Sequence, residues 1–486
     1  MIRSKLSSPL ILMLLSINVM GQNAIEEDTT IVKTNPVYGT VEAQVITTGD
    51  RVPFWMRSLQ HGSIPLNGTS FSLIGSVIKD YQPGKKSALD WGGGLMLRTN
   101  LGAKAEAILV EAYAKVKFKQ FEFRAGRSRA VYGLMDTSLG SGSFAVAGNA
   151  LGIPQIGISV PDYSFPIFDS LLSFKGNYTQ GWLGETPVNI LGTKKQLSTF
   201  YHQKSLHMRM GKPDWRVKGI VGIVHHVYWN NGKEMWGDAY TLTPFQTYIY
   251  VVTGTNYTYK PGQNIDATSN VGNHIGSIDL GLEISGKSLN TFLYHQVLYE
   301  SENSFKNGSL SDGLTGISIS NPDAQYGGFQ FRKLVLEYFR TVDQAYTPTR
   351  PYNYDSYFNH EFIINGNSYR GTGVGNPFIT RRTDMVSSLP TGDYRNFFTN
   401  TRLTLFHAGL QFSVNKFLIT TRVSSSRNLG VYESVSNFPP SSQLSASLEA
   451  AVLLKNRWQL RGMFAFDNGE LLYNTSGGYI SLARSF

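Results

Sequence analysis

The segment that decides the fold is EAYAKVKFK at positions 111–119, followed after one residue by FEFRA at positions 121–125. Apolar side chains occupy every even position of the first run and every odd position of the second, and most of the other positions are charged. Because successive side chains of a strand point to opposite faces, this pattern predicts an antiparallel hairpin with one apolar and one polar face.

The same alternation recurs along the chain, at positions 278–284, 334–338, 444–454 and 458–466. Several of these runs last nine to eleven residues. Strands average about five to six residues in globular proteins, whereas a tilted strand needs about 9–11 residues to cross a bilayer. The fold class predicted is therefore all-β, a transmembrane antiparallel β-barrel. An ordinary soluble β core is the alternative.

The C-terminal segment GYISLARSF, at positions 478–486, supports the barrel. Ile480, Leu482 and Phe486 share one face of the predicted strand, and Arg484 is the exception on that face. A terminal Phe that closes an alternating strand resembles the last strand of bacterial outer-membrane barrels. Aromatic residues near predicted strand ends, such as Trp458, fit the girdles that such barrels place at the membrane interfaces.

The composition excludes several other classes. Of 486 residues, 16% are charged and 13% aromatic, and none is Cys. Disordered chains have few aromatic residues and many charges, and helical bundles are rich in Ala, Glu, Lys and Leu. The absence of Cys excludes disulfides, a Cys nucleophile and Cys-ligated metal centres. The net charge is +10, but the longest basic runs are pairs, so we expect no nucleic-acid partner.

The N-terminus divides the chain into three parts. Residues 1–21 read as a cleaved signal peptide, with Arg3 and Lys5 before a short apolar core. Residues 22–40 are predicted to form a periplasmic segment and residues 41–486 the barrel, in the outer membrane of a Gram-negative bacterium. About 465 residues, at roughly 25 for each strand with its connection, give about 18 strands. Residues 127–168 and 194–204 are candidate plug or loop segments, the latter a possible short helix.

Several motifs resemble capsule assembly proteins of the Wzi family. They are the segments PFWMRSLQHG at 53–62, SGSFAVAGN at 141–149, IPQI at 153–156, HQKSLHMR at 202–209 and VHHVYW at 224–229. The resemblance covers most of residues 40–486. It implies an outer-membrane barrel of about 18 strands, with helical material occluding its periplasmic side, that binds capsular polysaccharide at the cell surface. A family pattern with a helical bundle is poorly matched before Val41.

Motifs for catalysis or cofactors are weak. Residues 281–288 (GLEISGKS) satisfy the P-loop pattern, but the alternation of a strand runs through them, so Gly286 and Lys287 read as a hairpin turn. The adjacent His225 and His226 point to opposite faces of a strand, and no HExxH or GxSxG motif occurs. We therefore expect no enzymatic activity, no cofactor and no metal site.

Two segments combine aromatic and polar side chains, as sugar binding requires, because sugar C–H faces stack on aromatic rings and polar groups bind the hydroxyls. The first candidate set is His226, Tyr228, Trp229 and Trp236. The second is Tyr352, Tyr354, Asp355 and Tyr357, with Arg381 and Arg382 nearby to pair with acidic sugars. An aromatic girdle with ordinary loops is the alternative for both.

The function predicted is a non-enzymatic outer-membrane barrel that binds capsular polysaccharide or exopolysaccharide and supports capsule assembly. Its other partners are expected to be outer-membrane lipid and the barrel-insertion machinery. An open diffusion pore and, less well matched, a surface hydrolase are the alternatives.

Overall fold

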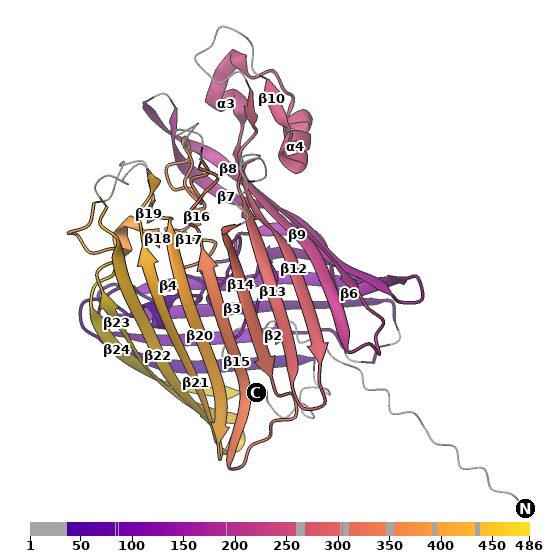
Figure 1. Ribbon diagram of the computed structural model, residues 1–486, viewed down its shortest axis with the longest axis vertical. Coiled ribbons are helices and arrows are strands. Elements are labelled where there is room, and N and C mark those ends of the chain that lie inside the picture. Colours follow the sequence, from indigo (N-terminus) through magenta and orange to yellow (C-terminus); the bar gives the residue numbers. More distant parts are fainter. Residues whose placement is uncertain are drawn as a thin grey trace, which may run out of the picture.

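The structure is a computed structural model that describes residues 36–486, except 83, 86, 191, 259–267, 302–303, 305–310, 347–353, 391–395 and 433–437. Eighteen of its strands form a single antiparallel sheet that closes on itself, and Figure 1 shows the resulting barrel. The all-β barrel and the number of strands expected from the sequence are both confirmed.

The strands follow one another around the wall in chain order. The first nine are β1 (Val37–Thr48), β2 (Ser70–Lys79), β3 (Leu89–Leu101), β4 (Glu106–Phe118), β5 (Phe121–Arg127), β6 (Gln155–Ile167), β7 (Leu172–Ile190), β8 (Thr193–Met210) and β9 (Val217–Asn230). The other nine are β12 (Asn273–Ser285), β13 (Asn290–Tyr299), β14 (Gly313–Ser320), β15 (Phe329–Arg340), β20 (Leu403–Val414), β21 (Phe417–Asn428), β22 (Ser441–Leu453), β23 (Trp458–Gly469) and β24 (Thr475–Ser485).

The first and last strands close the barrel. β1 pairs with β2 on one side and with β24 on the other, where Val45 lies opposite Ile480. The C-terminal segment is therefore the closing strand, as its alternation predicts. Because this pairing leaves no free edge, every strand of the wall has a hydrogen-bonded neighbour on both sides, which a bilayer requires of any spanning sheet.

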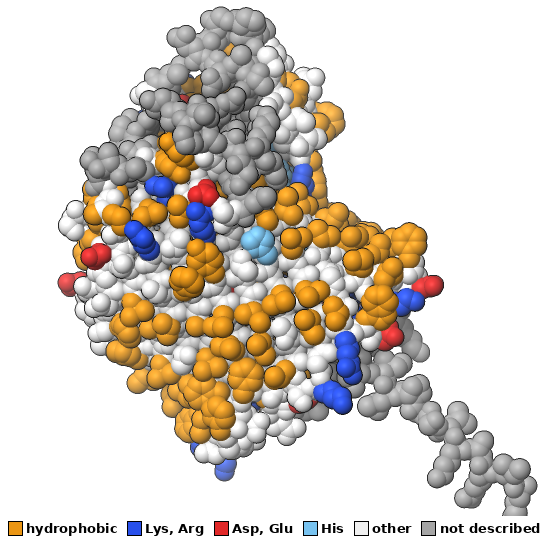
Figure 2. Space-filling view, in the orientation of Figure 1, with side chains coloured by type: hydrophobic (Ala, Val, Ile, Leu, Met, Phe, Trp, Pro, Cys, Tyr) orange, Lys and Arg blue, Asp and Glu red, His pale blue; other side chains and the backbone are white. Residues whose placement is uncertain are grey.

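The two faces of the wall differ as the opening hairpin predicts. On β4, Val116 and Phe118 are 39% and 47% exposed on the outside, whereas Glu111 and Lys115 are buried inside. Figure 2 shows apolar side chains gathered in a band across the visible face of the barrel wall. This arrangement, apolar outside and polar inside, is that of an outer-membrane β-barrel; we call the apolar band the lipid belt.

The two ends of the barrel have different connections. The end that holds β1's first residue and the C-terminal Phe486 has short turns, such as residues 286–289 between β12 and β13, closed by the Gly286 N–H to the Leu289 carbonyl at 2.9 Å. The P-loop-like motif is therefore a hairpin turn, as expected. The opposite end has long connections. In such barrels short turns are periplasmic and long loops extracellular, so we call these the short-turn end and the long-loop end.

Small elements lie in the long connections and in one turn. They are α2 (Phe54–Arg57), α3 (Gly232–Trp236), η1 (Gly237–Ala239), α4 (Pro244–Thr253), β10 (Asn256–Thr258), β11 (Thr268–Asn270), β16 (Ser368–Tyr369), β17 (Thr372–Gly373), β18 (Thr380–Arg381), η3 (Arg382–Asp384), β19 (Phe398–Asn400) and η5 (Lys455–Arg457). None of the helices in the described part of the chain combines the length and hydrophobicity needed to cross a bilayer.

Three of the predicted boundaries need correction. Residues 194–204 are not a plug or helix but lie within β8, which pairs with β7 and β9 along this stretch. Of residues 127–168, only 128–154 form a loop, because β6 occupies Gln155–Ile167. The first strand begins at Val37 rather than at 41. The predicted signal peptide, 1–21, and most of the segment 22–40 lie outside the described residues.

The lipid belt is open to a direct test on β22, where Leu448 is 50% exposed and the next residue toward the N-terminus, Ser447, is buried against the lumen. Leu448→Arg is expected to destabilise the folded barrel by about 2–4 kcal/mol, because it places a charge near the middle of the hydrocarbon layer. Folding into vesicles followed by urea titration measures this, with Ser447→Ala as the control on the opposite face. Equal stability of the two variants would contradict a lipid-facing Leu448.

Candidate functional site at the long-loop end

Three connections from the long-loop end fold into the barrel and fill its lumen. They are residues 49–69 between β1 and β2, residues 128–154 between β5 and β6, and the described residues of 341–402 between β15 and β20. We call these three segments the plug. Many of its side chains are almost completely buried, among them Trp55, Phe144 and Phe358. Among the described residues, loops of the chain rather than a helical bundle occupy the lumen.

Polar side chains of the wall hold residues 128–154 by their backbone. Glu337 on β15 accepts a hydrogen bond from the Ser141 N–H at 2.6 Å and another from the Tyr294 hydroxyl. Gln296 on β13 accepts one from the Phe144 N–H at 3.1 Å. A loop buried in this way must satisfy its peptide groups, and the inward-facing residues of distant strands supply the partners.

Further side chains of β15 and of the two strands next to it, β20 and β21, hold the same loop. Asp136, in the same loop, pairs with Lys333 of β15 at 3.1 Å. Arg422 of β21 donates to the Ser138 carbonyl at 2.7 Å, and His407 of β20 lies 2.7 Å from the Leu139 carbonyl. The contacts of Lys333 and Arg422 are charge-assisted, and such contacts are stronger than neutral ones. The loop is thus fixed to the wall at several points.

The other two segments of the plug meet in a buried ion cluster. Asp384 accepts two hydrogen bonds from Arg381, at 2.9 and 2.8 Å, and lies 3.4 Å from Arg57 at the end of α2. Burial by itself would raise the pKa of the Asp384 carboxyl, but the two guanidinium groups hold that pKa below its usual value. The carboxylate therefore stays ionised and joins residues 49–69 to residues 341–402.

An aromatic cluster forms the apolar centre of the plug. The ring of Phe144 lies 5.2 Å from Tyr357 and 5.0 Å from Phe358, both in near-perpendicular contact. Phe54 lies 4.4 Å from Phe378. Aromatic pairs at such distances add about 0.5–1.5 kcal/mol each beyond the area they bury, so all three segments share one core.

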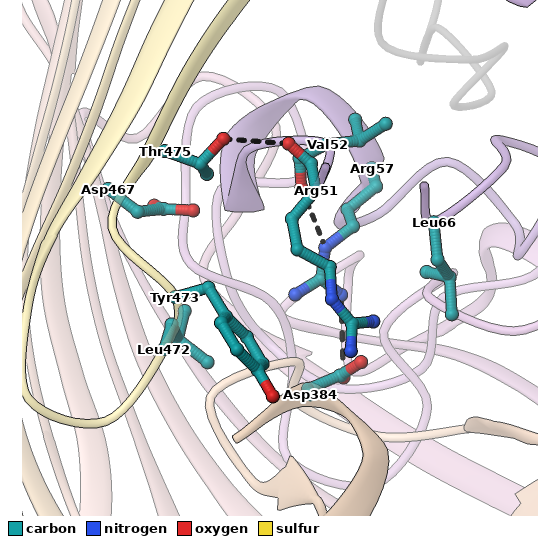
Figure 3. Close-up of a pocket in the computed structure, with 9 residues that line it drawn as sticks. All are labelled: Arg51, Val52, Arg57, Leu66, Asp384, Asp467, Leu472, Tyr473 and Thr475. Atoms are coloured by element: carbon teal, nitrogen blue, oxygen red, sulfur yellow. Dashed lines mark hydrogen bonds and ion pairs between the residues drawn. The ribbon is translucent and has the colours of Figure 1, made fainter. Parts of the chain in front are cut away.

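The mouth above the plug carries a hollow, shown in Figure 3. Its water-accessible volume is only about 10 Å³, far below the usual size of small-molecule sites. Its lining residues are Arg51, Val52, Arg57, Leu66, Asp384, Asp467, Leu472, Tyr473 and Thr475. The guanidinium of Arg51 lies 4.7 Å from the centre of the Tyr473 ring. A half-buried cation on an aromatic ring thus lies at the edge of a shallow, solvent-open depression.

A second surface at the same end consists of stacked tyrosines, which we call the tyrosine stack. The ring of Tyr432 lies 4.9 Å from Tyr346, with an angle of 17° between the ring planes, and 4.7 Å from Tyr354. Arg402 lies 4.0 Å from the Tyr432 ring centre, and Tyr346 is 37% exposed. The stack again combines aromatic faces with a cation.

The structure separates the first predicted set of sugar contacts. His226 and Tyr228 face the lumen and are fully buried, so they cannot meet a polymer outside the barrel in this arrangement. Trp229 lies on the outer side, 4.7 Å from Phe200, and Trp236 packs 4.9 Å from Phe362. The two neighbouring histidines do point to opposite faces, since His225 contacts His274 at 2.9 Å on the outer side.

The second predicted set is also divided. Tyr352 lies outside the described residues, and Tyr354 is part of the tyrosine stack. Asp355 and Tyr357 are buried, the former bound to Ser301 and Ser304 and the latter in the core of the plug. Arg381 belongs to the ion cluster with Asp384, and Arg382 donates to the Asn396 carbonyl at 3.2 Å. Because Asp355, Tyr357 and Arg381 are buried, they belong to the internal structure of the plug and are not exposed at the mouth.

Sequence reasoning missed the residues that the mouth does expose, Arg51, Tyr473, Arg402 and Tyr432. Each lies in or beside a connection with no periodic pattern, and its partner is distant in the sequence, so only the fold brings the pairs together. Within the described residues, no group of three or more His, Asp or Glu side chains is arranged to hold a metal ion.

Comparisons with known proteins find only remote likenesses. No family model matches the chain, and no curated protein matches it. Among solved structures, it is similar to Acinetobacter baumannii OccAB4 (TM-score 0.48, 7% identity, covering 93% of this chain and 98% of that one). It is also similar to Pseudomonas aeruginosa OccK9 (TM-score 0.46, 12% identity, 93% and 97%) and to the outer membrane protein opdK from Pseudomonas aeruginosa (0.44, 10%, 93% and 98%). Likenesses this remote carry no information on function.

The attachment of the plug predicts how the lumen responds to mutation. Glu337→Ala leaves the buried Ser141 N–H without its partner, which costs about 1–3 kcal/mol and loosens residues 128–154. Single-channel recording in planar bilayers is expected to show little current for the parent protein and frequent openings for Glu337→Ala.

The matched control is Glu283→Ala on β12, because Glu283 pairs with Arg209 on the wall, at 3.9 Å, rather than with the plug. Closed behaviour is expected for this control. A large steady conductance already present in the parent protein would contradict a lumen closed by the plug.

Proposed function

We propose that this outer-membrane barrel binds an acidic capsular polysaccharide or exopolysaccharide at its long-loop end and supports capsule assembly on the surface of a Gram-negative bacterium. The binding is non-enzymatic and uses no cofactor. The proposal includes export by a cleaved signal peptide and insertion by the barrel-insertion machinery.

The observation that carries the proposal is the filled lumen. Residues 128–154 are held to β13, β15, β20 and β21 through their own backbone, so a solute has no wide path past them. The surface left for a large ligand is then the mouth, where the hollow and the tyrosine stack lie. The segments 53–62 and 141–149, which resemble capsule assembly proteins, are parts of this same plug, and the resemblance supports the same function.

The chemistry of the mouth suits an acidic sugar polymer. Tyr473 and Tyr432 each offer an aromatic ring with an arginine beside it, Arg51 at 4.7 Å and Arg402 at 4.0 Å. Rings stack on the C–H faces of sugars, and guanidinium groups pair with carboxylates. Each contact is weak, but a repeating polymer engages both surfaces at once, and multivalency then raises the overall affinity.

A narrow, selective channel is the second candidate. The lumen wall near the short-turn end carries charged side chains, among them Lys115, Glu122 and Arg461, and a charged lumen suits the passage of small polar solutes. Opening such a path would break apolar contacts between the plug and the wall, such as that of Phe144 with Phe339 of β15, whose ring centres lie 6.5 Å apart. Conductance through the parent protein separates this candidate from the first.

Retention on immobilised acidic polysaccharide tests polymer binding. The double variant Arg51→Gln/Tyr473→Ala and the single variant Tyr354→Ala are each expected to weaken retention about three- to tenfold, because a cation–π or stacking contact is worth about 0.5–1.5 kcal/mol. High salt is expected to weaken the parent protein's retention as well, since exposed charge pairs are screened.

The control is Tyr326→Ala, because Tyr326 has the same kind of arginine contact, with Arg332 at 4.5 Å, but lies in the turn between β14 and β15 at the opposite end of the barrel. Its retention is expected to match the parent's. An equal loss of retention in all three variants, or no retention of the parent protein on any acidic polymer, would contradict the proposal.

A further inference from the structure

The helix α4 (Pro244–Thr253) lies on the outside of the barrel, in the connection between β9 and β12. Figure 1 shows it beyond the upper end of β9, beside α3 and β10. Its limits are set locally: Thr243 and Gln246 form a reciprocal capping box at the start, and Gly254 ends it in the left-handed conformation. The helix is therefore a defined element, and its sequence PFQTYIYVVT contains no charged residue.

One face of α4 is fixed to the outer side of the wall. Val251 is fully buried in a cluster with Val227 of β9. The Tyr248 hydroxyl lies 2.8 Å from the Tyr178 hydroxyl of β7, and Lys204 of β8 donates to the Val252 carbonyl in the last turn of the helix. Three neighbouring strands hold the helix, so its orientation on the barrel is determined.

The outer wall surface that α4 packs against is directly continuous with the lipid belt. Along β8, the next residue on the same face after Lys204 is Leu206, which is 54% exposed. Along β9, the next after His225 is Ile223, which is 45% exposed. Side chains on one face of a strand repeat every second residue, at about 7 Å. The residues that contact α4 therefore lie one such step beyond lipid-facing side chains, toward the long-loop end.

The opposite face of α4 is apolar and uncovered. Phe245 is 74% exposed and Ile249 is 44% exposed, and residues four apart lie on the same side of a helix. None of the large apolar side chains in the described residues is more exposed than Phe245. In Figure 2, apolar side chains lie on this upper projection on the same side as the belt below. An uncharged helix with such a face is poorly suited to water.

We propose that α4 is an interfacial anchor, whose Phe245 and Ile249 insert among the acyl chains of the outer leaflet next to the barrel wall. The occupant of this face is lipid, because the face continues the lipid belt and carries aromatic and aliphatic groups without charge. Helices of this kind lie in the membrane interface with their apolar side buried below the headgroups. The anchor fixes residues 231–258 against the membrane, beside the mouth rather than across it.

The absence of Cys from the chain allows a clean test with single-cysteine variants carrying a polarity-sensitive fluorophore. Phe245→Cys and Ile249→Cys are labelled in the full-length protein reconstituted in phosphatidylcholine vesicles. Lys233→Cys on the exposed side of α3 is the matched control in the same connection. We expect blue-shifted emission at positions 245 and 249 and at least twofold quenching by lipids brominated near the headgroup end of the acyl chain, with neither effect at 233.

Emission at 245 and 249 that matches the control, without quenching by brominated lipid, would overturn the proposal. So would a blue shift that disappears when protein is diluted with excess lipid, since a second copy of the chain would then cover the face, or a shift that occurs only after polysaccharide is added. Heat-modifiable migration of each variant on gels confirms that the barrel has folded. The anchor does not depend on the ligand of the mouth.

Discussion

The requirement that every peptide group in the bilayer has a hydrogen-bond partner governs this structure. An open sheet of seventeen paired interfaces would leave two free edges in lipid. The pairing of β1 with β24 removes both edges. Once the wall is closed, strand periodicity fixes the rest: one face must meet lipid, and the other is free to be polar. The inward polar residues are then available as partners for whatever enters the lumen.

The plug obeys the same requirement by another route. Residues 128–154 have little regular structure, so their peptide groups are satisfied by side chains of the wall, as with Ser141 on Glu337 and Phe144 on Gln296. The polar side chains that face the lumen thus supply the hydrogen-bond donors and acceptors that allow irregular backbone to be buried there. The aromatic cluster around Phe144 then gives the three plug segments a common core.

The sequence predicted what depends on local periodicity and missed what depends on contacts between distant residues. The hairpin of β4 and β5, the closing strand and the barrel size follow from alternation and length. Residues 194–204 were misassigned because this part of β8 extends past the lipid belt, so that Lys194, Lys195 and Gln196 are exposed and conceal the strand. The pairs Arg51–Tyr473 and Arg402–Tyr432 join separate loops, so no local sequence pattern predicts them.

Aromatic residues serve three distinct purposes here, and their surroundings tell them apart. Those packed on one another without solvent, such as Phe144 with Phe358, form the plug. Those exposed beside aliphatic side chains, such as Phe464 on β23, face lipid. Those at the mouth carry an arginine on the ring, and a cation there is favoured only where water or an anionic ligand also reaches it. The third environment is the one suited to recognising an acidic polymer, because it keeps both charge and ring available at the surface.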